Sequence, residues 1–444
     1  MKQIFKNLWS QRAQNVWLLA ELVLVCFVAW KQLDPIAVRM YYRSLPKGID
    51  CERLVVAHTA PTDTRWYESD NVDRVFRQKI NVLKRKLQAI DEVEQVCILY
   101  PIKGLLAPRN MFSHSVDDEG EQYLYGDDSV HVYETSYIKN EHFFETYGIH
   151  AAEGSPTAEE LSKSNEGFVI SRSLAERLYG SAKAAIGKEI RHRMIFTDDK
   201  IGEYEWVSSS HIQGVVEDVH VSDTSFDTWR VYWGTPDCPL IYAHSQLVIR
   251  LKPDADVRRF VEEQNFRLRQ FTSEGLAIVS FTPYEDIATS KNQFASPMLS
   301  YDFNLSVATA LFFLINLCLG VIGTFWMQTK RRTEESGIMR AFGATRWRIM
   351  GMFLAEGFVL TTLSMIITSI LYLNYVKTGL GSLCINPQLP QCQPDPTWVA
   401  DKPLHFCILA GIVYLVILIV VSIGITIPAW NICRTKPVEA LREE

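Results

Sequence analysis

Three long runs without a charged residue restrict this chain more than any other feature of its sequence. Residues 303–329, 357–376 and 403–433 contain no Asp, Glu, Lys or Arg. Each run supplies the roughly 20 apolar residues that a helix needs to cross a bilayer, and buried helices of soluble proteins rarely need such length. The sequence therefore predicts three membrane spans, at about 303–328, 351–376 and 404–428.

A fourth apolar segment, Val16–Trp30, lies near the N-terminus and carries Glu21 close to its centre. The basic residues before it are also typical of a secretory signal peptide. However, the sequence "VAWKQLDP" offers no small-x-small cleavage site, and a carboxylate is foreign to the apolar part of a signal peptide. We interpret the segment as a retained first span, so that residues 1–30 form the cytoplasmic N-terminus and the first transmembrane helix.

Basic residues gather on one side of the predicted spans. Residues 1–12, the loop 330–348 and the tail 434–444 together hold twelve Lys and Arg against five Glu, a net charge of +7. The loop 377–403 holds two Lys balanced by two Asp. By the positive-inside rule, both termini and the loop 330–348 lie in the cytoplasm. The block 31–300 then forms one large periplasmic domain of a multi-pass protein of the cell inner membrane.

The charge balance also limits the partners of the periplasmic block. The whole chain has a net charge of −6, so the residues outside the three basic segments carry −13. An acidic domain is a poor partner for nucleic acid and for anionic lipid, because like charges repel. We expect membrane lipid around the spans and no nucleic-acid partner.

Two strand–helix–strand patterns lie at the two ends of the periplasmic block, over 53–100 and 245–281. Apolar residues of the first helix recur at steps of four and three, which places them on one face. Two such patterns far apart predict a split α/β subdomain with an insertion at about 104–240. The apolar residues of the first helix are Phe76, Ile80, Leu83, Leu87 and Ile90.

These patterns define the expected fold class. It is an α-helical membrane protein with four transmembrane helices plus a large α+β extracytoplasmic domain inserted between the first and second helices. The periplasmic domain covers 31–300, the membrane domain with the last three spans covers 301–433, and 434–444 is a cytoplasmic tail.

Within the insertion, "ISRSLAERLYG" predicts a short helix. Ser173 and Glu176 have the spacing of a capping box at its start, and Gly180 is the expected stop. In "HIQGVVEDV", Gly214 marks a strand position where a neighbouring group comes close.

No motif indicates an enzyme. In "GSAKAAIGKEI", six residues separate Gly180 from Gly187, and Glu189 follows Lys188 where a phosphate loop needs Ser or Thr. The histidines form no HExxH pair, the serines no GxSxG elbow and the cysteines no CxxC spacing. We expect no catalytic residue, no metal site and no cofactor.

Two of the nine cysteines, Cys384 and Cys392, share the short loop "CINPQLPQC" on the periplasmic side. An oxidising compartment favours a disulfide between them. Two free thiols are the alternative.

The basic loop itself has the pattern of a short amphipathic helix. Ile338, Ala341 and Phe342 fall on one side, Gly343 stops the helix, and Thr345 is placed to cap the next one. The apolar side fits a groove in a partner protein. Alternatively, the helix lies on the inner leaflet, held there by its basic residues.

The segment from Arg332 to Ala344 reads "RTEESGIMRAFGA", and it resembles the R-x-x-E-I-G-I-x-x-A-L-G-A segment of ABC-transporter permeases of the MacB/FtsX type. Glu356 in "FLAEG" and the tail "KPVEALREE" are also similar to that family. So are "EHFFETYGIHAAEG", "FVISRSLAERLYGSAKAAIGKEI" and "IQGVVEDV" in the periplasmic block. The resemblance covers about two thirds of the chain. Ser336 departs from it, because the family prefers isoleucine there.

The resemblance implies a permease subunit whose ATP hydrolysis occurs in a separate cytoplasmic ABC ATPase, since the chain has no fused ATPase domain. Such permeases transmit movement to a periplasmic domain for export, lipoprotein extraction or activation of a hydrolase, with a periplasmic adaptor or hydrolase as a further partner. A membrane-anchored extracytoplasmic ligand sensor and a tethered hydrolase are the rival functions. The expected ATPase-coupling residues are Glu334, Glu335, Gly337, Ile338, Arg340, Ala341, Phe342, Gly343 and Ala344.

The second predicted span has small residues at small-xxx-small spacing, where helix backbones approach closely. We expect them at an interface with a second permease copy or a homologous permease, with packing inside one chain as the alternative. The residues are Ser306 with Ala310 and Gly320 with Thr324.

Two glutamates, Glu21 and Glu356, lie in apolar surroundings of the predicted spans. A carboxylate that faces lipid is costly, so we expect both to face protein or a crevice. For Glu356, reaching toward the cytoplasmic interface is the alternative.

Overall fold

The computed structural model divides the chain into two compact units. Met1–Met40, Phe303–Asn386 and Pro396–Glu444 form the first, here called the helical unit, and Tyr41–Asp302 with Pro387–Asp395 form the second, the sheet unit. The structure describes residues 12–434 except 64, 66–71, 100–121, 126–127, 164–166, 199–201, 222–225, 236–245, 290–302, 332–337, 341 and 378–394.

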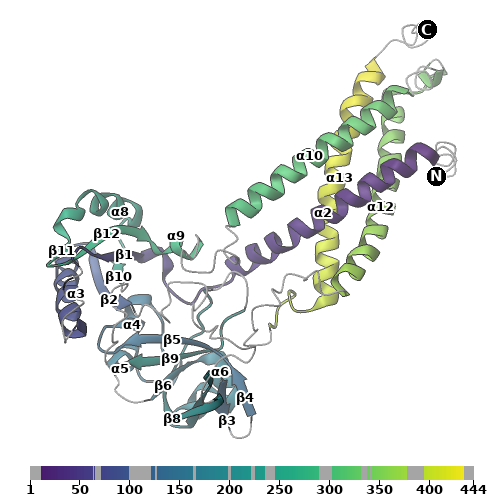
Figure 1. The fold of residues 1–444 in the computed structure, drawn as a ribbon. Coiled ribbons are helices and arrows are strands. Elements are labelled where there is room, and N and C mark those ends of the chain that lie inside the picture. Colours follow the sequence, from purple (N-terminus) through teal and green to yellow (C-terminus); the bar gives the residue numbers. More distant parts are fainter. Residues whose placement is uncertain are drawn as a thin grey trace. The chain divides into compact units, whose positions relative to one another are not determined.

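Where the structure describes the helical unit, four long helices form it (Figure 1): most of α2 (Arg12–Ser44), α10 (Phe303–Arg331), α12 (Arg346–Lys377) and α13 (Lys402–Arg434). Val16–Ser44, Arg346–Lys377 and Lys402–Ile427 are long and apolar enough to cross a membrane. The predicted second span coincides with α10, whose side chains the structure describes in part.

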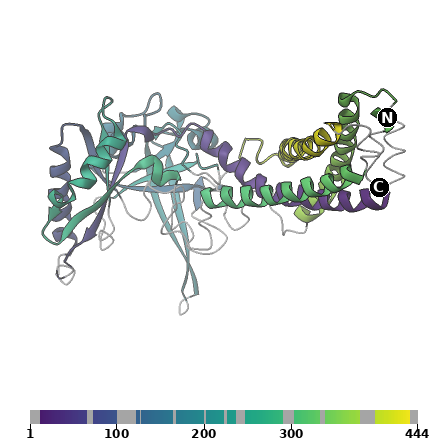
Figure 2. The same ribbon diagram turned by 90° about the horizontal axis from the view of Figure 1, so that it is seen from above.

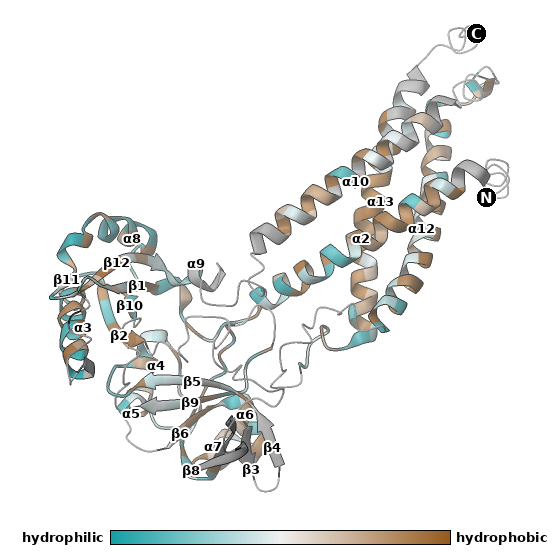
Figure 3. Ribbon diagram, in the orientation of Figure 1, coloured by the Kyte–Doolittle hydropathy of each residue, from teal (hydrophilic) through white to brown (hydrophobic). Residues whose placement is uncertain are grey.

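The first helix is longer than the predicted span, because α2 continues past Trp30 to Ser44. Figure 3 shows hydrophilic residues toward this end of α2. Val38 and Tyr42 nevertheless remain buried on one side of the helix, so this part of α2 is amphipathic. Pro35 lies inside the helix, and the boundary between the two units falls at Met40.

The core of the helical unit joins α2, α12 and α13. Leu22, Trp30, Phe353, Val413 and Val421 are buried in it. Figures 1 and 2 show α10 beside α2, and α10 also packs against α13. Large apolar side chains on the outward faces of these helices remain exposed, as expected where lipid replaces water.

The first sheet of the sheet unit has the order β11-β12-β1-β10-β2, and all of its strand pairs are antiparallel. Helix α3 (Val72–Gln88) connects β1 to β2, and α8 (Val257–Phe266) with η4 (Leu268–Gln270) connects β10 toward β12. This is the strand order of a βαββαβ, ferredoxin-like fold. The strands are β1 (Leu54–Pro61), β2 (Val93–Leu99), β10 (Gln246–Leu251), β11 (Thr272–Ser273) and β12 (Leu276–Pro283).

Both faces of this sheet are buried. On one face, Val55 and Ala57 of β1 pack against the apolar side of α3, where Phe76, Ile80, Leu83 and Leu87 are buried as predicted. On the other face, Leu54 and Val56 pack against α4 (Phe143–Tyr147). Because successive strand residues point to opposite faces, β1 contributes to two cores and reads as a continuous apolar run.

The inserted segment forms a second, mixed sheet with the order β4-β3-β7-β8-β6-β9-β5. Two of its pairs, β5–β9 and β6–β8, are parallel. The strands are β3 (Gln122–Tyr125), β4 (Asp128–His131), β5 (Tyr133–Ile138), β6 (Phe168–Ser171), β7 (Glu189–Asp198), β8 (Gly202–Val216) and β9 (Arg230–Thr235). The short helices are α5 (Ala158–Lys163), α6 (Arg172–Tyr179), α7 (Ala182–Ala185), η1 (Cys51–Arg53) and α9 (Tyr284–Thr289).

Gly214 of β8 has the close neighbour that its position predicted, because a Cβ there would overlap the Leu161 side chain. The predicted capping box of α6 was wrong. Ser171 is the N-cap, and Asp218 Oδ1 accepts the hydrogen bond from the Ser173 N–H at 2.9 Å. Gly180 does end the helix, with a φ of +80°.

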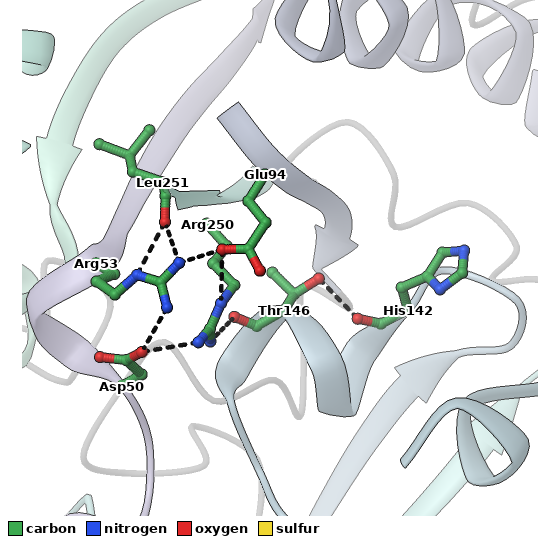
Figure 4. Close-up of polar contacts among 7 residues, drawn as sticks. All are labelled: Asp50, Arg53, Glu94, His142, Thr146, Arg250 and Leu251. Carbon is green, nitrogen blue, oxygen red and sulfur yellow. Dashed lines mark hydrogen bonds and ion pairs between the residues drawn. The ribbon is translucent and has the colours of Figure 1, made fainter. Parts of the chain in front are cut away.

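An ion-pair network connects the first sheet with α4 of the inserted segment (Figure 4). Arg250 of β10 donates to Asp50 Oδ2 at 2.8 Å and to the Thr146 carbonyl at 3.2 Å. Arg53 donates to Asp50, to Glu94 of β2 and to the Leu251 carbonyl. The Arg250 side chain also lies where a Cβ on Gly148, the C-cap of α4, would be. The network therefore ties α4 to β10, and through Asp50 and Arg53 to the neighbouring strand β2 of the first sheet.

Candidate functional site

Helix α12 begins at the end of the helical unit where α2 begins and α13 ends (Figure 1). Gly343 N–H donates to the Arg340 carbonyl at 3.0 Å, and Ala344 N–H donates to the Met339 carbonyl at 2.9 Å. This pair of bonds is a Schellman motif, and Gly343 has the left-handed backbone that the motif requires, with a φ of +88°. The stop predicted at Gly343 is present.

Thr345 then caps α12, as its position predicted. Its Oγ1 accepts from the Arg348 N–H at 3.3 Å, and its carbonyl accepts from the Ile349 N–H at 3.2 Å. Met339 and Ala344 pack against the core of the helical unit. The segment is therefore fixed to α12 by backbone bonds and to the core by apolar contacts.

Three large apolar side chains of this segment point into solvent. Phe342 is 88% exposed, Trp347 is 72% exposed and Ile338 is 47% exposed. Trp347 makes an edge-to-face contact with Trp430 of α13 at a centroid distance of 6.0 Å. We call Ile338, Phe342 and Trp347 the 338–347 patch. Exposed aromatic groups on a rigid backbone are well suited to a partner surface, since little conformational freedom is lost on binding.

Five of the nine expected coupling residues are described by the structure: Ile338, Arg340, Phe342, Gly343 and Ala344. Two of them belong to the patch, whereas Ala344 faces the core. Glu334, Glu335, Gly337 and Ala341 lie outside the described residues. Sequence reasoning missed Trp347. Its signal was an indole in the first turn of α12, among the charges of "TRWR".

Glu21 faces α10 of its own chain. Its Oε1 lies 3.2 Å from where a Cβ on Gly320 would be. The glycine therefore provides space for the carboxylate, and at this position close packing occurs inside one chain. Of the other small residues of α10, Ala310 is half-buried, while the side chains of Ser306 and Thr324 are not described.

Glu356 is buried in α12. The next residue, Gly357, marks the closest approach of α12 and α13, because a Cβ there would overlap Ile425 Cδ1. Glu356 therefore lies on the protein-facing side of its helix.

The predicted disulfide falls on residues outside the described part of the chain, since 378–394 are not described. Cys26, Cys51, Cys97 and Cys407 are free thiols. Burial raises the pKa of the Cys97 thiol to about 12, which leaves it protonated and unreactive. Among the described residues, no group of three His, Cys, Asp or Glu side chains could hold a metal ion.

Residues 307–437 match the family model of the FtsX-like permease C-terminal domain. The chain carries an FtsX-like permease domain. The match spans α10, the 338–347 patch, α12 and α13, and it confirms the resemblance to FtsX-type permeases. In the described part of the chain, three helices are apolar enough to span a membrane, and together with this domain they point to a multi-pass protein of the inner membrane.

Other comparisons add little to the FtsX-like assignment. A crystallised domain from Porphyromonas gingivalis, whose name assigns it to a permease protein, has 14% sequence identity and a TM-score of 0.29. The similarity covers 56% of this chain and 94% of that domain, and it is too low to support an inference. None of the curated proteins matches the chain.

Proposed function

We propose that this chain is the permease subunit of an ABC transporter complex and transmits ATP-driven conformational change from a separate cytoplasmic ATPase to a periplasmic domain. The observation that carries the proposal is the 338–347 patch within the FtsX-like domain. Phe342 is 88% exposed, yet its backbone is closed by the Schellman motif and joined to the capped start of α12. A partner that binds the patch would therefore act directly on a membrane helix.

The proposed topology has four spans, with α10 as the second. Both termini and the 338–347 patch are cytoplasmic, and the sheet unit is periplasmic. The +7 charge of the two terminal segments and the loop 330–348 supports this orientation. ATP would be hydrolysed by the separate subunit.

The complex would contain two permeases, either two copies of this chain or this chain with a homologous permease. The small residues at the Ser306 end of α10 are the proposed contact. A periplasmic adaptor or hydrolase would receive the movement of the sheet unit, in export, lipoprotein extraction or hydrolase activation. A ligand sensor would also have a large external domain, but it would not need the 338–347 patch.

The test compares Phe342→Ala with Phe358→Ala. Phe358 is an exposed phenylalanine in the middle of α12, so the control removes the same group from the lipid-facing part of the helix. Both variants would be reconstituted with the ABC ATPase that co-purifies with the wild-type chain. Burying a phenylalanine contributes roughly 1.5–3 kcal/mol, so we expect Phe342→Ala to weaken ATPase binding about 10- to 100-fold.

ATPase binding and ATP turnover are the two measurements. Phe358→Ala should retain both at the wild-type level. Wild-type binding by Phe342→Ala would contradict the coupling role and leave the membrane-surface interpretation of the loop as the better one.

A further inference from the structure

A polar cluster is enclosed within the apolar core of the helical unit. Asp34 of α2 accepts a hydrogen bond from the Tyr372 hydroxyl of α12 at 2.8 Å through Oδ2. Its Oδ1 lies 2.9 Å from His405 Nε2 of α13. All three side chains are at most 2% exposed. We call these residues the Asp34 cluster.

The contacts of His405 determine how many protons the cluster holds. Its Nδ1 lies 2.9 Å from the Val399 carbonyl, which can only accept, so Nδ1 carries a hydrogen. Its Nε2 faces a carboxylate oxygen, so one more proton lies between these two atoms. Whether that proton resides on His405 or on Asp34, the pair has no net charge. A neutral Asp34–His405 pair whose remaining polar atoms bond to Tyr372 and to the Val399 carbonyl is compatible with a buried site.

Aromatic rings close the space around the cluster. Trp30 stacks on Tyr372 at a centroid distance of 4.6 Å, and Phe406 lies 5.1 Å from Trp30. Trp398 makes an edge contact with the His405 ring at 5.1 Å. With water excluded, the hydrogen bonds cannot be exchanged for hydration, so the three helices cannot slide past one another here without leaving polar groups unpaired.

The Asp34 cluster lies where movement of α12 and α13 could be passed to the last turns of α2. Pro35 follows Asp34 directly, and a proline inside a helix removes one backbone hydrogen bond and allows a bend. Beyond it, α2 carries the chain across the unit boundary at Met40. At the other end of the unit, α12 begins at the 338–347 patch.

We propose that the Asp34 cluster is the joint through which movement of α12 and α13 passes into α2 and from there along the chain to the sheet unit. Asp34 would hold α2 at the residue before Pro35, so that displacement of Tyr372 and His405 turns the segment beyond Pro35. This inference rests on the proposed function, since it needs an ATPase that moves α12.

Two nearly isosteric variants test the joint, Asp34→Asn and His405→Gln. The matched control is Tyr414→Phe, which removes a 3.0 Å hydrogen bond between Tyr414 of α13 and Thr362 of α12 but leaves α2 untouched. ATPase stimulation is measured in the full reconstituted complex. Spin labels on the helical unit and the sheet unit report the distance change upon addition of ATP.

We expect both joint variants to bind the ATPase like the wild type and to lose the ATP-dependent distance change, whereas Tyr414→Phe keeps it. The double variant Asp34→Asn/His405→Gln should lose no more of the ATP-dependent distance change than either single variant. The swap of Asp34→His with His405→Asp should restore part of the movement, which a purely structural role would not predict. If the single variants fail to insert, Tyr372→Phe removes one hydrogen bond while retaining the ring stack, and it should reduce the distance change.

Undiminished movement in Asp34→Asn, His405→Gln and Tyr372→Phe would overturn the joint while leaving the proposed function intact. An equal loss of the distance change in Tyr414→Phe would also overturn the joint. Any hydrogen bond between these helices would then be enough to transmit the movement. A wild-type complex that binds ATPase but shows no movement, or binds none, would refute the proposed function and the joint together.

Discussion

Gly343 has open space where a Cβ would lie, so its left-handed backbone, and not its surroundings, restricts the residue at this position. We predict that Gly343→Val and Gly343→Asn differ. A non-glycine residue costs roughly 1–2 kcal/mol in this conformation, and asparagine tolerates it best. Valine should therefore displace the 338–347 patch and lower ATPase recruitment several-fold, while asparagine retains most of it.

Co-purification and ATP turnover of the two variants provide the measurement. Insertion and protease resistance of the sheet unit should be unchanged in both. Equal activity of the valine and asparagine variants would show that the Schellman geometry does not matter for coupling.

Residues whose role depends on near neighbours in sequence could be predicted. Gly343 and Thr345 follow from local backbone rules. The capping of α6 was misassigned, because the carboxylate of Asp218 comes from a position 45 residues away. The Asp34 cluster could not be predicted at all, since Asp34 and His405 are 371 positions apart and neither belongs to a motif.

At the scale of the helices, the crossing of α12 and α13 depends on Gly357. A Cβ there would overlap Ile425 Cδ1, which is the far end of a flexible side chain. We predict that Gly357→Ala destabilises the protein by about 1–3 kcal/mol through overpacking. Adding Ile425→Val removes the overlapping methyl group and should restore most of that stability.

Gly411→Ala is the control, because this glycine of α13 has no neighbour within 4 Å of an added Cβ. It should be neutral or slightly stabilising. Thermal unfolding in detergent gives the comparison. A Gly357→Ala variant as stable as Gly411→Ala would show that α12 and α13 can separate at no cost.

Elements with a strong apolar period were predicted well, whereas their extent and pairing were not. The hydropathy of α2 falls after Trp30, but the helix continues because Val38 and Tyr42 still have partners to bury against. Similarly, the sequence indicated strands in the insertion. It could not reveal that β6 lies between β8 and β9, because pairing between distant strands leaves no periodic signal.

For the whole molecule, the proposed dimer places the Ser306 end of α10 at the contact between two permeases. We predict that a cysteine at Ser306 or Ala310 forms cross-links between subunits, in a background whose native cysteines are replaced. A cysteine pair at Glu21 and Gly320 should instead cross-link inside one chain, because these positions face each other there. Gel electrophoresis without reductant separates the two products. Cross-links from Ser306 and Ala310 that stay within one chain would contradict this interface.

The split of the first sheet has a consequence for how the protein is made. Every strand pair of that sheet except β11–β12 joins a residue before 100 to a residue after 245. As the chain emerges from the ribosome, β1 and β2 have no partner, since β10 must enter between them. The apolar side chains of β1 and β2 therefore stay unpaired until the whole insertion has been synthesised. Pairing between strands so far apart in sequence is slow, and the unpaired strands are prone to aggregation. Any break in synthesis before residue 246 therefore leaves a fragment that needs a chaperone or is degraded.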